Sequence, residues 1–97
     1  MASTAAKALL RANLGYPDET SVPAGLVQMM ENDLDTAQAD LLRDGIELDL
    51  SKAGDLNLLV MYATWLWRKR ATGEGKGRML REAINDRKVA KATEAPT

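Results

Sequence analysis

The longest apolar run in the chain extends from Leu56 to Trp67 and is broken only by Asn57 and Thr64. A helix on the surface of a small protein needs one apolar stripe, roughly 100° wide. Wound as a helix, this run instead places apolar side chains nearly all the way round. We therefore predict a helix that is either buried by its neighbours on every side or keeps part of its surface for another subunit.

This third helix is expected to be capped by Ser51 or Asp55 and to end near Ala71. The second helix is expected to begin near Pro23, with Ser21 as its cap, and to end at Gly45. Its apolar face consists of Leu26, Met30, Leu34, Ala37 and Leu41, and the opposite side, interpreted as solvent-facing, carries Glu31, Asp33, Asp35 and Asp40. Residues 3–14 form the first helix, and a fourth follows the glycines at 73–77, with Met79, Leu80, Ala83 and Ile84 as its apolar residues.

Residues 46–50, Ile-Glu-Leu-Asp-Leu, alternate between apolar and polar, which is the pattern of a short strand. One strand has no partner within this chain, so we favour an extended connector pinned to the core, unless copies pair between subunits. The predicted fold class is all-α: a small bundle of about four helices with a short extended connector before the third helix. Residues 1–89 form a single helical domain, and residues 90–97, which lack apolar periodicity, form a disordered tail.

The composition excludes several classes of site. The chain of 97 residues contains neither cysteine nor histidine, so it has no disulfide, thiol nucleophile, zinc cluster or imidazole base. Residues 72–77, Thr-Gly-Glu-Gly-Lys-Gly, lack the spacing of a phosphate-binding loop and follow a helix rather than a strand. The acidic residues of the second helix are not arranged as a calcium loop. We expect no enzyme activity, cofactor or metal.

The sequence also bears on the location of the protein. The run from Leu56 to Trp67 is too short to span a bilayer, which takes about 20 residues. Residues 1–7 lack the apolar core of a signal peptide. We therefore expect no membrane contact and synthesis in the cytoplasm.

Charge is unevenly distributed along the chain. Residues 1–67 hold four basic against ten acidic side chains, a net charge of −6, whereas residues 68–97 hold nine basic against four acidic, a net charge of +5. This split either suits an oriented contact, with nucleic acid or between unlike faces of neighbouring subunits, or cancels within the fold. One alternative is therefore a small DNA-binding or regulatory protein that uses the basic cluster at residues 68–88. The glycine-rich turn is long for a helix-turn-helix reader.

The stretch from Asp55 through Asn85 carries two linked motifs. The first consists of Asp55, Leu58, Leu59, Met61, Tyr62, Ala63, Trp65, Leu66, Trp67 and the triplet Arg68, Lys69 and Arg70. The second consists of Thr72, Gly73, Glu74 and Gly75, then Arg78, Met79, Leu80 and Arg81, then Ala83, Ile84 and Asn85. Together they resemble the small head–tail connector proteins (adaptor or head-completion proteins) of tailed bacteriophages. The amino-terminal half of the chain matches that family only in its layout of helix, break, helix and linker.

The resemblance implies a mostly helical protein without catalytic activity that joins a ring, typically a dodecamer, beneath the portal of the DNA-filled head. Such a ring extends the DNA channel and docks the next component. The implied partners are the portal protein, the downstream neck or tail protein, other copies of the chain and, nonspecifically, packaged DNA. The implied location is the neck of the virion, after synthesis in the bacterial host cytoplasm.

Candidate contact residues follow from the aromatic and basic positions. Contacts with a neighbouring subunit or the portal are expected at Tyr62, Trp65, Trp67, Arg68, Lys69 and Arg70. Contacts with the DNA channel or a partner are expected at Arg78, Arg81, Arg87 and Lys88.

Overall fold

The chain folds into four helices in the part that the computed structural model describes, which comprises residues 4–16, 22–73 and 75–94. They are α1 (Thr4–Asn13), α2 (Ala24–Arg43), α3 (Ala53–Thr72) and α4 (Arg78–Glu94). No strand occurs among these described residues. The predicted all-α bundle is confirmed.

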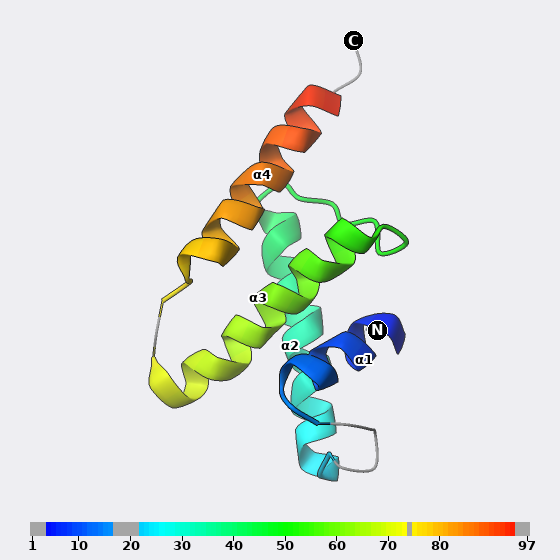
Figure 1. The fold of residues 1–97 in the computed structure, drawn as a ribbon, viewed down its shortest axis with the longest axis vertical. Helices are drawn as coiled ribbons and strands as arrows, with labels where there is room; N and C mark the ends of the chain where they lie inside the picture. The colour runs from blue at the N-terminus through cyan, green and yellow to red at the C-terminus, as the bar shows by residue number, and fades with distance from the viewer. Residues whose placement is uncertain (1–3, 17–21, 74, 95–97) are drawn as a thin grey trace.

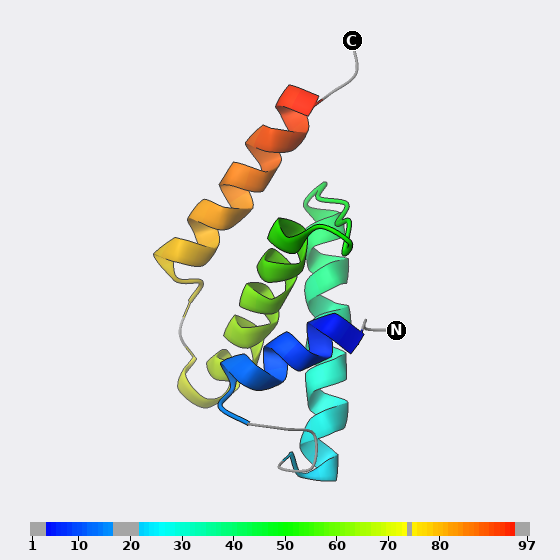
Figure 2. The same ribbon diagram turned by 45° about the vertical axis from the view of Figure 1, so that its right-hand side comes forward.

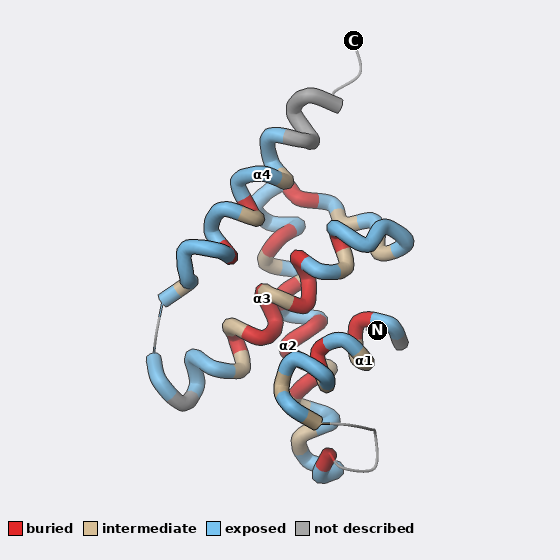
Figure 3. Tube along the Cα trace, viewed as in Figure 1, coloured by how far each residue is buried: buried red, intermediate tan, exposed pale blue. Residues whose placement is uncertain are grey.

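Helix α3 lies at the centre of the bundle and contacts α1, α2 and α4 (Figure 1). Figure 3 shows buried residues along much of α3 and on α2 beside it. Leu58, Leu59 and Val60 are buried although they are consecutive, which requires neighbours on several sides of the helix. The intramolecular reading of the apolar run is therefore correct for most of its length, whereas Met61, Trp65 and Trp67 remain partly exposed.

Helix α2 places its predicted apolar face against α3 and α1. Met30, Leu34, Ala37 and Leu41 are buried as expected, while Leu26 is only partly buried. The largest side chains with almost no exposed surface are Leu10, Leu34, Leu41, Ile46 and Leu59. Each such side chain stabilises the fold by roughly 1.5–3 kcal/mol relative to full exposure.

The end of α2 follows the prediction, but the start of α3 does not. Gly45 has a φ of 89°, and the amide of Ile46 donates to the carbonyl of Leu41 at 2.8 Å, so the left-handed glycine ends the helix. The residue that precedes α3 is Lys52, without a side-chain cap. The backbone amide and the hydroxyl of Ser51 instead both donate hydrogen bonds to the carboxylate of Asp49. The cap predicted at Ser21 lies outside the described residues.

The extended connector is confirmed, but the predicted start of a disordered tail is wrong. Residues 46–49 are neither helix nor strand; Ile46 is fully buried and Leu48 packs against the core. Helix α4 continues to Glu94, past the expected end at residue 89. Alanine and lysine have a high helix propensity even without an apolar face, so the lack of apolar periodicity after residue 89 does not indicate disorder. Residues 95–97 lie outside the described part.

Helix α4 packs on α3 through Leu80 and Ile84, and its C-terminal end then projects beyond the rest of the bundle (Figure 2). The molecule measures 48 × 28 × 19 Å. Within the described segments, every helix is too short or too polar to cross a bilayer.

Candidate functional site

A hollow of about 380 Å³ lies where α3, the glycine-rich turn and the start of α4 meet. We call it the α3–α4 hollow. Its apolar lining comes from Met61, Trp65, Met79 and Leu80, and Arg68 contributes a cationic side chain. Met79 is 76% exposed, the highest value among the large hydrophobic side chains that the structure describes. An apolar recess beside exposed apolar and basic side chains is the kind of surface on which a protein partner packs.

The Trp65 ring is held in one orientation by its neighbours. Its centroid lies 5.3 Å from that of Tyr62, with the ring planes at 89°, which is an edge-to-face contact. Lys69 places its Nζ atom 4.6 Å from the Trp65 centroid, and Lys76 places its own at 5.2 Å. Both are cation–π contacts. The hollow thus has a fixed aromatic wall with two lysines beside it.

Tyr62 serves the core of the monomer. The side chain is buried, and its hydroxyl donates to Oδ2 of Asp40 at 3.2 Å. Burial, followed by the negative charge of Asp40, raises the pKa of Tyr62 to about 12. It therefore offers no surface to a neighbouring subunit in this conformation. Trp67, also a predicted contact, is half-buried against the core.

Arg70 forms an ion pair inside the bundle. Its guanidinium donates hydrogen bonds to both carboxylate oxygens of Asp33, including one from Nη1 to Oδ2 at 3.0 Å. Hydrogen bonding to Asp33 raises the pKa of Arg70. Asp33 is 2% exposed, so its interpretation as a solvent-facing residue is wrong. It stands three residues after Met30 and four before Ala37, which places it on the core face. The spacing of Asp33 from Met30 and Ala37 therefore indicates burial, although its residue type suggests exposure.

Arg87 forms a second internal ion pair, with Asp55. Its Nε atom donates to Oδ1 at 2.7 Å and its Nη2 atom to Oδ2 at 3.3 Å. Burial would raise the pKa of Asp55, but the hydrogen bonds from Arg87 and from the Asp49 amide outweigh it, so that pKa lies below its ordinary value. Arg87 thus fastens α4 to α3.

The other predicted cations remain on the surface. Arg68, Arg78, Arg81 and Lys88 are exposed, as is Lys69 beside Trp65. Arg78 pairs with Glu82 at 2.8 Å, an exposed i,i+4 contact worth about 0.3–0.5 kcal/mol. The structure brings Trp65 and Arg68 together at the hollow, and Lys69 contacts the Trp65 ring. The sequence identified Met61 and Met79 only as apolar helix positions, and no pattern in it predicts the contact of Lys76 with Trp65.

Acidic residues do not assemble a metal site in the described segments, where no group of three or more potential ligands converges. No family model, curated protein or solved structure matches the chain. The function must therefore be inferred from the sequence and from the geometry of the hollow.

Proposed function

We propose that the chain is a head–tail connector of a tailed bacteriophage, which assembles as a ring beneath the portal, extends the DNA channel and docks the next neck or tail component. The observation that carries this proposal is the fold of residues 55–85. This stretch, on which the family resemblance depends, forms α3, the glycine-rich turn and the first part of α4, which line the α3–α4 hollow together with Asn13 at the end of α1.

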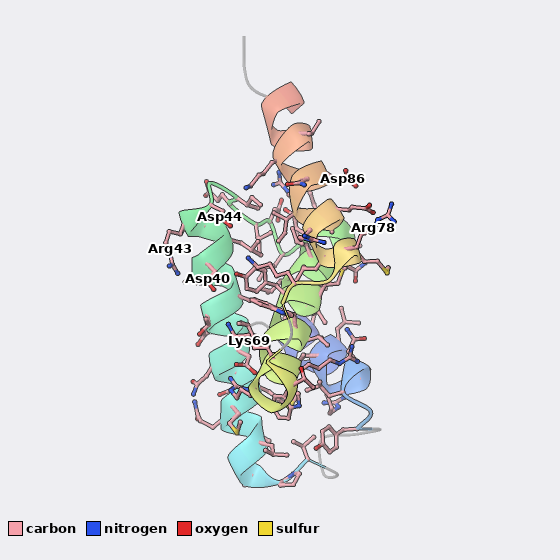
Figure 4. The ribbon with its side chains drawn as sticks, turned by 90° about the vertical axis from the view of Figure 1, so that its left-hand side faces the viewer. Asp40, Arg43, Asp44, Lys69, Arg78 and Asp86 are labelled. Carbon is pink, nitrogen blue, oxygen red and sulfur yellow. The ribbon has the colours of Figure 1, made fainter. Side chains whose placement is uncertain are left out.

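Ring formation needs heterologous contacts, in which two different patches of one subunit meet on successive neighbours. Opposite charge on the two patches supports such an arrangement. Figure 4 shows Arg43 and Asp44 at the end of α2 on one side of the molecule and Arg78 and Asp86, both on α4, on the other. Arg68 lines the hollow, and Lys69 and Lys76 lie over the ring of Trp65, whereas Asp44 and Glu47 are exposed near the end of α2.

Helix α3 would then have two roles. Its buried residues hold α1, α2 and α4 together, and its partly exposed Met61 and Trp65 contribute to assembly. The portal, the downstream neck or tail protein and packaged DNA are the proposed partners, in the neck of the virion. Exposed cations on α4, such as Arg81 and Lys88, are available to DNA in the channel or to a partner.

Size-exclusion chromatography with light scattering tests ring formation, with the chain alone and after mixing with the portal of the same phage. We expect a closed oligomer at least in the presence of portal, which electron microscopy would show as a ring. Portal mixed with an unrelated helical protein of equal size is the control. A chain that stays monomeric and does not bind portal would contradict the proposal.

A DNA-binding protein is the alternative, favoured by the exposed Arg68, Arg81 and Lys88. It predicts duplex binding that weakens steeply with salt and is lost when these residues become alanine. Arg70 is unsuitable for that test because it neutralises the buried Asp33. A connector should retain little affinity for free duplex at physiological salt.

A further inference from the structure

Helix α4 contributes little to the core of the bundle. On α4, Leu80 and Ile84 are buried, whereas Met79 and Val89 are exposed. The largest side chains with almost no exposed surface all lie in α1, α2, α3 or the connector; they are Leu10, Leu34, Leu41, Ile46 and Leu59. The elements that precede α4 therefore share a core of their own, and α4 packs on the outside of it.

The contact between α3 and α4 is narrow. Two hollows lie between the helices, the α3–α4 hollow near the start of α4 and another of about 350 Å³ farther along, and Met61 lines both. Leu80 and Ile84 provide the buried apolar contact, and Arg87 donates hydrogen bonds to Asp55. In the described part, α4 is thus held chiefly by two aliphatic side chains and one guanidinium rather than by a continuous apolar face.

The turn between α3 and α4 contains two glycines that this conformation does not require. Gly73 ends α3 with a φ of 69°, but neither Gly75 nor Gly77 has a positive φ. A β-carbon at either position would meet no atom within 4 Å beyond the adjacent residues. A residue with a side chain would restrict the unfolded chain and so stabilise this conformation, whereas glycine leaves the turn free to adopt another. We therefore interpret Gly75 and Gly77 as a hinge.

We propose that neighbouring copies in the ring exchange α4, so that the helix of each copy packs on α3 of the next copy instead of on its own. This inference rests on the proposed ring and names its subunit contact. The exchange requires no new surface, because Leu80, Ile84 and Arg87 would make in the neighbour the contacts that they make here within one copy. Each copy gives one helix and accepts one, which is a heterologous contact that can close into a ring.

The surface of α3 under α4, which we call the α4 seat and define as Asp55, Leu58 and Met61, restricts what can occupy it. Leu58 and Met61 are apolar and line the hollows beside α4, so an occupant must cover them. The side chain of Asp55 is 7% exposed, so the occupant must also supply a cation, since a buried carboxylate without one is strongly unfavourable. The α4 of a second copy satisfies both requirements.

Concentration should decide between the closed and the exchanged forms. Both contain the same contacts between α3 and α4, so the free-energy difference between them arises from association and from the conformation of the turn. Dilute copies should therefore remain closed monomers. The portal holds copies side by side and raises their effective concentration, which favours exchange.

Cross-linking between α3 and α4 tests in which copy the helix lies. Asn57→Cys and Asp86→Cys, combined in one chain that otherwise lacks cysteine, place two thiols at exposed positions that line the same hollow. A short bis-maleimide should join them within single chains in the dilute monomer, and should give a ladder of covalent multimers on a denaturing gel once the ring has formed on the portal. Lys7→Cys with Glu31→Cys, between α1 and α2, is the matched control and should give single chains in both samples.

The length of the turn provides a second readout. Deleting residues 75–77 leaves a turn too short for α4 to return to its own α3, so this variant should assemble at a protein concentration at least about tenfold lower, a factor equal to about 1.4 kcal/mol. Inserting a glycine–serine segment after Gly77 should favour the closed monomer and raise that concentration. Circular dichroism verifies that both variants are folded.

The outcomes separate the exchange from the ring. Cross-links confined to single chains in an assembled ring would overturn the exchange and leave the ring standing. Loss of the cross-link on the portal, without multimers, would show that another protein has replaced α4 on its seat, and unchanged assembly in both turn variants would show that the turn does not control it; either result refutes the exchange. A wild-type chain that neither forms rings nor binds portal would overturn the proposed function as well.

Discussion

Arg87 of α4 donates hydrogen bonds to both carboxylate oxygens of Asp55, in the first turn of α3, and to the carbonyl oxygen of Glu47 in the connector, the last at 3.1 Å. Asp55 also accepts the backbone amide of Asp49 at 2.8 Å. One guanidinium and one carboxylate thus join α3, α4 and the connector. Together with the buried Leu80 and Ile84, this pair holds α4 against α3.

We expect Arg87→Met to lower the free energy of unfolding by about 3 kcal/mol, because it leaves the carboxylate of Asp55 buried without a counter-charge. The side chain of Asp55 is 7% exposed, so water cannot replace the lost partner. Urea denaturation measures the effect. Lys88→Met, at the next and exposed position, is the control and should change stability little. Equal losses from both variants would show that the ion pair is not a structural anchor.

Acid should destabilise the wild-type fold through the same carboxylate. The pKa of Asp55 is lowered in the fold, so its contribution is present above the ordinary aspartate pKa of about 3.9 and is lost as pH falls through the lower folded value. In Arg87→Met the effect of burial remains and only the Asp49 amide still donates to the carboxylate, so protonation of Asp55 should cost less stability than in the wild type. Urea denaturation of both proteins below about pH 4.5 tests this. An equal loss of unfolding free energy with falling pH in the wild type and in Arg87→Met would contradict this prediction.

The helices and much of the core were predictable because they depend on local spacing. Met30, Leu34, Ala37 and Leu41 recur at steps of three and four, and a helix with that pattern has one face to bury. The left-handed end at Gly45 likewise needs only local chemistry. These features do not require knowledge of which helix lies opposite.

The site was less predictable because it depends on how the helices pack. In a helix that is apolar nearly all round, spacing cannot rank the faces, so buried Tyr62 and partly exposed Trp65 looked equivalent. Asp33, the partner of Arg70, lies 37 residues away on α2, and no local sequence pattern connects the two residues. The position of Lys76 above Trp65 depends on the path of the turn.

Arg68 and Arg70, two residues apart, should behave differently when replaced. Arg70→Met should lower the free energy of unfolding by about 2–3 kcal/mol, because Asp33 is left buried and unpaired; the loss is moderated because Arg70 itself is partly exposed. Arg68→Met should leave stability nearly unchanged and weaken assembly if the hollow is the contact. Thermal or urea unfolding and light scattering separate the two effects. A large loss of stability from Arg68→Met would refute this division of roles.

Alkaline pH should destabilise the fold through Tyr62. The pKa of Tyr62 is raised from 10.0 to about 12 by burial and by Asp40, so the folded state favours the neutral phenol. The stability that this preference provides is complete below pH 10 and disappears as the pH rises towards the folded value, because the unfolded tyrosine ionises first. Urea denaturation should therefore show a loss over that interval that is smaller in Tyr62→Phe. In the folded protein, tyrosinate absorbance should show one tyrosine that titrates late, and an equal alkaline loss in wild type and Tyr62→Phe would mean that another group is responsible.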